Sequence, residues 1–140
     1  MKKSRIIDAN VVLRFLTNDE PEMARDCEML LLRVEENREQ VYLPDIILAD
    51  IVWTLEKFYK VPKVKIRELL LPIVGLKGMR CNSKSIIRQA FIIYVENNID
   101  WTDAFVAASM QTSGQEIIYS YDRDFDKIDG LNRTIPSSSI

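Results

Sequence analysis

The sequence has no histidine, only two cysteines, and no apolar run approaching the roughly 18 residues of a membrane span. Without histidine there is no Ser-His-Asp or Cys-His catalysis, no imidazole base and none of the usual zinc sites. Cys27 and Cys81 form no close metal-binding or redox spacing, so we interpret them as apolar fillers of a reduced, cytoplasmic protein. Any chemistry must therefore rely on carboxylates, hydroxyls, lysines or a bound metal ion.

The composition is that of an ordinary globular protein. The chain has 140 residues, of which 47% are hydrophobic and 29% charged, with 4 Gly and 5 Pro. This length suits one domain, and no linker or internal repeat divides it. We therefore predict one domain over residues 1–135, followed by a flexible tail over 136–140.

The net charge of −2 conceals a segregation of charge along the chain. Residues 57–88 carry nine bases and one acid, while 19–39 and 96–129 each carry eight acids, against three and two bases. A basic middle between acidic flanks could bind phosphates around an acidic centre. The alternative is that these side chains solvate exposed helices. The candidate phosphate-binding residues are Lys57, Lys60, Lys63, Lys65, Arg67, Lys77 and Arg80.

Short apolar stretches alternate with longer helical patterns. The patterns predict strands at 5–7, 40–43, 79–81 and 116–121, and helices at 11–16, 21–34, 46–59, 63–74, 86–96 and 104–110, with a helical turn at 122–126. Asp45, Ser83 and Thr102 are expected to cap helices, and Gly75 and Gly114 to end them. This alternation predicts an α/β protein whose parallel sheet is covered on both sides.

Several acids stand at the ends of these elements. Asp8 and Asp122 each follow a strand, and right-handed crossovers place the carboxyl ends of parallel strands at one edge of a sheet. Asp103 falls in the first turn of a helix, and Asp50 lies on an otherwise apolar one. Each has a structural alternative: a helix cap, a favourable place in the helix dipole, a polar turn, or a solvent-facing residue.

Four carboxylates brought together would repel one another, so something must compensate them. Mg²⁺ or Mn²⁺ would do so, because these hard ions prefer carboxylate and water oxygens. Such an ion can activate water against a phosphodiester and neutralise the developing charge. This chemistry needs no histidine and no covalent nucleophile.

The ordered motifs resemble those of PIN-domain ribonucleases, most closely the VapC-type toxins of toxin–antitoxin systems. The resemblance is carried by Ile6-Ile7-Asp8-Ala9-Asn10, Leu48-Ala49-Asp50-Ile51-Val52, Asp100-Trp101-Thr102-Asp103-Ala104 and Ser120-Tyr121-Asp122-Arg123-Asp124-Phe125. It covers the chain from Arg5 to about Ile135. Any one motif is weak, whereas the ordered set is fairly specific.

The resemblance implies a three-layer α/β/α sandwich and a Mg²⁺- or Mn²⁺-dependent endoribonuclease that uses metal-activated water. It implies metal-binding, catalytic carboxylates at Asp8, Asp103 and Asp122. Asp50, which we expect to bind the metal with them as a fourth catalytic carboxylate, stands where the family usually has Glu, one methylene longer. The resemblance further implies Asp124 as an additional ligand, and Asn10, Ser120 and Asp100 as supporting groups. It also implies an RNA substrate, which makes the candidate phosphate-binding residues candidate RNA-binding residues, together with a homodimer and a cognate antitoxin.

Three other functions are weighed against the nuclease. The shorter Asp50 leaves open a catalytically inert PIN-like module that binds RNA or protein. A phosphoryl-transfer enzyme of the haloacid-dehalogenase type suits Asp8 but expects a second acid two residues later, where Asn10 stands. A phospho-receiver domain also clusters acids, but its other functional positions find no match here.

Overall fold

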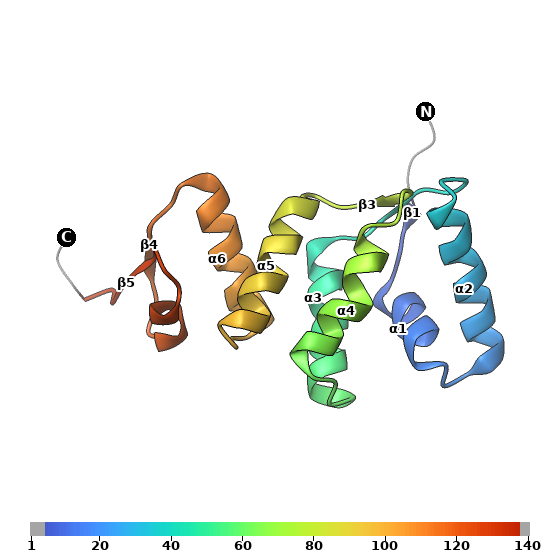
Figure 1. Cartoon of the computed structure of the whole chain (residues 1–140), viewed down its shortest axis with the longest axis horizontal. Helices are drawn as coiled ribbons and strands as arrows, with labels where there is room; N and C mark the ends of the chain where they lie inside the picture. Colours follow the sequence, from blue (N-terminus) through green and yellow to red (C-terminus); the bar gives the residue numbers. More distant parts are fainter. Residues whose placement is uncertain (1–4, 138–140) are drawn as a thin grey trace. The chain divides into compact units, whose positions relative to one another are not determined.

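The computed structural model describes residues 5–137 and forms two compact units, Met1–Lys84 and Ser85–Ile140. Residues 138–140, which belong to the predicted tail, lie outside the described residues. In chain order the first unit contains β1 (Arg5–Ile6), α1 (Ala9–Thr17), α2 (Pro21–Glu35), β2 (Val41–Tyr42), α3 (Asp45–Trp53), the π-helical turn η1 (Thr54–Phe58), α4 (Lys63–Val74) and β3 (Met79–Arg80) (Figure 1). In the second unit are α5 (Lys84–Glu96), which starts at the boundary, α6 (Trp101–Ser113), β4 (Ile117–Tyr119), the 3-10 turn η2 (Arg123–Lys127) and β5 (Asn132–Thr134).

The first unit is built on a parallel sheet with strand order β1-β2-β3. Arg5 pairs with Val41, and Val41 pairs with Met79. All three strands therefore end on the same edge, and Asp8 follows β1 there. Apolar side chains from every helix of this unit are buried, among them Val12, Val34, Leu48, Leu55 and Ile66. The sheet edge that carries Asp8 thus rests on a well-packed core.

A close backbone approach fixes the entry to β3. The Gly78 amide donates to the Val34 carbonyl at 2.9 Å. A Cβ added to Gly78 would lie 2.2 Å from the Glu39 carbonyl oxygen and 2.8 Å from that of Val34. Only glycine fits between these backbone atoms. The link from α4 to β3 is consequently intolerant of any side chain at this position.

An aromatic cluster organises the second unit. Phe91 and Trp101 have ring centroids 4.4 Å apart, and Tyr94 and Trp101 lie 5.6 Å apart edge to face. Small residues on the buried face of α6, Ala104 and Ala107, allow close packing beside these rings. Strands β4 and β5 form a separate parallel pair, with Ile117 opposite Asn132. The elements that carry the remaining candidate acids therefore belong to this unit.

The predicted alternation of short strands and longer helices is confirmed, with differences at individual elements. β5 was not predicted, because Asn132-Arg133-Thr134 has no apolar alternation and is recruited by pairing with β4. The expected cap at Thr102 is wrong, since α6 begins at Trp101 with Asp100 in the capping position. Gly114 ends α6 in the left-handed conformation, as expected.

Candidate metal centre

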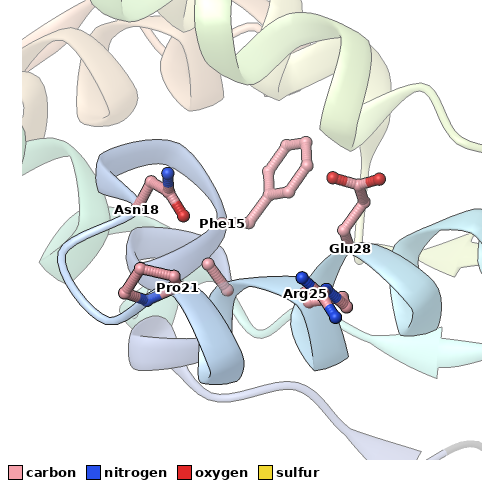
Figure 2. Close-up of a pocket in the computed structure, with 6 residues that line it drawn as sticks. Phe15, Asn18, Pro21, Arg25 and Glu28 are labelled. Atoms are coloured by element: carbon pink, nitrogen blue, oxygen red, sulfur yellow. The ribbon is translucent and has the colours of Figure 1, made fainter.

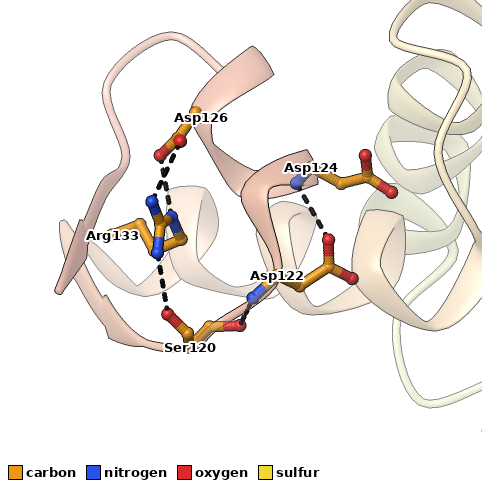
Figure 3. Close-up of polar contacts among 5 residues, drawn as sticks. All are labelled: Ser120, Asp122, Asp124, Asp126 and Arg133. Carbon is orange, nitrogen blue, oxygen red and sulfur yellow. Dashed lines mark hydrogen bonds and ion pairs between the residues drawn. The ribbon is translucent and has the colours of Figure 1, made fainter. Parts of the chain in front are cut away.

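The turn after β4 orients two carboxylates. The Ser120 hydroxyl accepts a hydrogen bond from the Asp122 amide at 3.0 Å, and the Asp122 carboxylate accepts one from the Asp124 amide at 2.9 Å. Figure 3 shows both carboxylates pointing to the same side of the turn. Asp122 is thus both the cap of η2 and a member of a carboxylate pair, so the structural and functional interpretations of this residue are compatible.

Arg133 on β5 braces the same turn from its other side (Figure 3). Its guanidinium donates to both carboxylate oxygens of Asp126, at 3.0 and 3.2 Å, and to the Ser120 carbonyl at 3.2 Å. A bidentate Arg–carboxylate pair fixes orientation better than a single contact does. The sequence analysis missed Arg133 because β5 itself was not predicted.

Asp103 completes the cluster from the first turn of α6. Single carboxylate oxygens of Asp103, Asp122 and Asp124 all lie within 4.8 Å of one another. We refer to these three residues as the acidic cluster. Asp103 and Asp124 are partly buried and Asp122 is exposed, so the cluster is open to solvent on one side. The structure therefore brings together three of the predicted ligands.

The pKa of the Asp103 carboxyl reflects its burial first and this crowding second. It is raised from 3.8 to about 6, and burial is the largest cause. A hydrogen bond with Asp122 comes next, followed by the negative charges of Asp122, Asp100 and Asp124. Near neutral pH, repulsion from the neighbouring carboxylates therefore opposes ionisation of Asp103. Lys127 offsets part of this charge, because its Nζ lies 3.2 Å from Asp124 Oδ1 on the next turn of η2.

The acidic cluster has the properties of a divalent-metal site. Mg²⁺ binds oxygen ligands at about 2.1 Å, so two ligands of one ion lie up to about 4.2 Å apart. The observed oxygens, within 4.8 Å, need only small side-chain movements to reach that range. A bound divalent cation would also relieve the repulsion that raises the pKa of Asp103. Oxygen-only donors favour Mg²⁺ or Mn²⁺ over zinc or copper.

Asp8 and Asp50 lie in the first unit, and both are exposed. Asp8 occupies the N-cap position of α1, yet its side chain makes no capping hydrogen bond. Its carboxylate is therefore available for another role. Asn10, the second residue of the same helix, is also exposed. The assembly of Asp8 and Asp50 with the acidic cluster into one centre stays a prediction.

A polar network at the ends of β2 and β3 was not predicted. The Tyr42 hydroxyl donates to the Asn82 side-chain oxygen at 2.9 Å, and the Asn82 amide donates to Asp45 Oδ2 at 3.1 Å. Asp45 was expected to cap α3, but the helix begins at Asp45, and Pro44 holds the capping position. The residues of this network are forty positions apart at most, so only the strand pairing brings them together.

The candidate RNA-binding residues differ in their surroundings. The Glu56 carboxylate contacts Lys57 at 3.0 Å and Lys63 at 3.3 Å. Lys65 lies 4.0 Å from Glu68, and Arg80 donates to the Lys77 carbonyl. Within residues 5–137, no ion pair involves the side chains of Lys60, Arg67 or Lys77. Phosphate binding by these three side chains stays a prediction.

Two hollows lie on the first unit. One, of about 450 Å³, lies at the junction of α1 and α2 and is lined by Phe15, Asn18, Pro21, Ala24, Arg25 and Glu28 (Figure 2). It contains none of the predicted metal ligands. The other, of about 280 Å³, lies between α1 and η1, and Asn10 is among the residues that line it.

Over residues 5–137, no helix combines the length and apolar character that a membrane crossing requires.

Comparison with known proteins identifies the class. Residues 5–131 match the PIN domain family, so the chain belongs to that family and has its α/β/α fold. A curated relative, the "VapC ribonuclease" of Aquifex aeolicus (strain VF5), is 23% identical over 124 residues, which are 89% of this chain and 91% of the relative. The resemblance inferred from the motifs, to PIN-domain proteins of the VapC type, is confirmed.

Proposed function

We propose that this protein is a Mg²⁺- or Mn²⁺-dependent endoribonuclease. The observation that carries the proposal is the acidic cluster, three converging carboxylates with a raised Asp103 pKa, in a chain of the PIN family. Carboxylates gathered at such a cost to one another are typical of functional sites rather than of a stabilising surface. The relative named as a VapC ribonuclease supports RNA as the substrate.

Each acid has a role in this proposal. Asp103, Asp122 and Asp124 hold the ion, and Asp8 and Asp50 complete its surroundings from the first unit. Ser120 and Arg133 keep the Asp122 turn in place through the contacts described above. When bound, the divalent ion would lower the pKa of a water molecule and neutralise charge that develops on the phosphodiester. With no histidine in the chain, the carboxylates are the available acceptors for the proton of that water.

The supporting groups act on substrate and on ligand position. Lys60, Arg67 and Lys77 would contact phosphates of the RNA, because no acid within the described residues neutralises them. Asn10 lies two residues after the predicted ligand Asp8 and would orient it through a hydrogen bond, whereas Asp100, three residues before Asp103, would act through bridging water. We further propose that the protein is the toxin of a toxin–antitoxin pair, acts as a homodimer and is neutralised by a small antitoxin.

An inert PIN-like module that only binds RNA or protein is the second candidate. The observation in its favour is Asp50, whose side chain is one methylene shorter than the Glu usual in the family. A shorter ligand could leave the ion too weakly held for turnover. This candidate predicts intact RNA or partner binding without cleavage at any metal concentration.

The test is incubation of the purified protein with mixed RNA and Mg²⁺, Mn²⁺ or EDTA, followed by analysis of the product ends. Attack by water on the phosphodiester is expected to give fragments with a 5′-phosphate and a 3′-hydroxyl, and EDTA is expected to abolish cleavage. Cleavage that persists in EDTA, or products with 2′,3′-cyclic phosphates, would contradict a metal-activated water. Tight metal and RNA binding without products would favour the inert module.

A further inference from the structure

The hollow between α1 and η1 has the lining of a nucleotide site. Its walls combine one face of α1 with the π-helical turn that follows α3. The lining residues are Asn10, Leu13, Arg14, Thr17, Asp19, Thr54, Phe58 and Tyr59. Two aromatic rings, a guanidinium, a carboxylate, an amide and hydroxyls thus surround one small space. We refer to it as the α1–η1 groove.

The volume of the groove limits what it can hold. Pockets for drug-sized ligands measure about 300–1,000 Å³, and this groove, at about 280 Å³, is at the lower limit. That space suits a single nucleotide better than a folded peptide segment. A nucleobase offers both a flat apolar face and a hydrogen-bonding edge, which matches a lining of aromatic and polar groups.

The groove lies beside the proposed chemistry. Asn10 is one of its lining residues and follows the candidate ligand Asp8 by two residues at the start of α1. Thr54 lines the opposite wall and lies one helical turn beyond the candidate ligand Asp50. Each of these two lining residues therefore lies within four residues of a proposed metal ligand. A nucleotide bound there would neighbour the phosphate that is cut.

Phe58 and Tyr59 line the groove within the segment Lys57-Phe58-Tyr59-Lys60, which we call the rim. Phe58 is 71% exposed, although a large apolar side chain gains nothing from water. Tyr59 packs edge to face against it, with ring centroids 4.9 Å apart, and donates to Asp19 at 3.0 Å. Lys60, in the left-handed conformation, directly follows this aromatic pair. Interleaved aromatic and basic side chains are typical of surfaces that bind single-stranded nucleic acid.

The backbone that leads into the rim forms a π-helical turn. The Tyr59 amide bonds to the Thr54 carbonyl, five residues earlier, and the Val61 amide bonds to the Leu55 carbonyl. Single π-helical turns inside α-helices recur at functional sites. Here the wide turn carries Thr54 and Phe58 on the groove wall.

We propose that the α1–η1 groove binds one unpaired nucleotide of the RNA substrate next to the cleaved phosphate, with its base stacked on Phe58. Asn10 and Arg14, whose guanidinium also pairs with Glu20 at 3.1 Å, face the bound nucleotide from α1, and Lys60 meets its flanking phosphate. The inference rests on the proposed ribonuclease function and adds to it a requirement for single-stranded RNA and a determinant of cleavage-site preference.

The test compares Phe58→Ala with Trp53→Ala. Trp53 is the matched control, because it is an exposed aromatic residue (61%) on the preceding turn that does not line the groove. Binding is measured in EDTA, where metal-dependent cleavage cannot occur, to short single-stranded RNAs that each carry one abasic position. Cleavage kinetics, cut-site distribution and sedimentation mass are measured separately.

We expect Phe58→Ala to weaken binding of single-stranded RNA at least about five-fold, the loss typical of one stacked base. Trp53→Ala and duplex RNA should show no such change. For wild-type protein, removing the base that stacks on Phe58 should weaken binding as much as Phe58→Ala does. The Phe58→Ala protein should bind that abasic RNA and the intact RNA equally. KM should rise with kcat nearly unchanged, and the preference for the nucleotide beside the cut should relax.

Equal losses in Phe58→Ala and Trp53→Ala, or an equal effect of every abasic position, would overturn the proposal. So would a Phe58→Ala protein that changes its oligomeric state but binds RNA normally, because the groove would then be an interface between copies. Failure of the proposed function is separate: it would appear as absent metal-dependent cleavage, while binding in EDTA would still report on Phe58.

Discussion

Metal binding by the acidic cluster should depend on pH through Asp103. With a pKa of about 6, this carboxyl holds a proton at pH 5 that a metal ion must displace, whereas at pH 7 it is mostly ionised. The ionised fraction falls from about nine-tenths to about one-tenth over that range, so metal affinity should fall about tenfold. A carboxyl with the ordinary pKa of 3.8 would produce almost no change over the same range.

The assay is a titration with Mn²⁺ at pH 5, 6 and 7, in which the electron paramagnetic resonance signal of the free ion is followed. The Asp103→Asn protein should bind more weakly and without this pH dependence. In the absence of metal, the same pKa predicts the direction in which the unfolding free energy changes with pH. Because the folded state holds the proton more tightly than the unfolded state, the unfolding free energy should fall as pH rises from about 4 to above 6. A wild-type Mn²⁺ affinity that does not change between pH 5 and pH 7 would refute the reasoning.

Three further outcomes are expected. Gly78→Ala should reduce the unfolding free energy by about 1–3 kcal/mol in denaturant titrations, since its Cβ would meet two backbone carbonyls, while Gly75→Ala serves as a milder control. Arg133→Met should weaken Mn²⁺ binding without removing a ligand, because the Ser120 and Asp126 contacts that hold the turn are lost; unchanged affinity would show that the turn needs no brace. Lys60→Glu should weaken RNA binding and reduce the slope of log affinity against log salt by about one or more. An unchanged slope would make Lys60 part of the solvated surface.

The sequence predicted those features that depend on local pattern. Strand-then-acid signals located Asp8 and Asp122. The expected cap at Thr102 placed Asp103 in a first turn, where it lies although α6 begins one residue earlier, at Trp101. The convergence of Asp103, Asp122 and Asp124 also followed from the ordered motifs, and the structure confirms their proximity.

Features that depend on distant pairing were not predictable. Arg133 lies on a strand with no apolar alternation, so neither β5 nor its contact with Ser120 has a local signal. The Tyr42–Asn82–Asp45 network exists because β2 and β3 pair. From the local sequence alone, an Asp that follows a proline is interpreted as a helix cap. The π-helical turn at 54–58 likewise has no residue signature, although it determines how Phe58 lies on the groove wall.

The most direct test of the nuclease centre compares cleavage of mixed RNA by wild-type, Asp103→Asn and Asp129→Asn proteins with Mn²⁺. Asp129 is an exposed acid that is not a member of the acidic cluster, so its substitution controls for the loss of one charge. The account predicts cleavage by wild-type and Asp129→Asn proteins and none by Asp103→Asn, with all three folded. Undiminished cleavage by Asp103→Asn would contradict it.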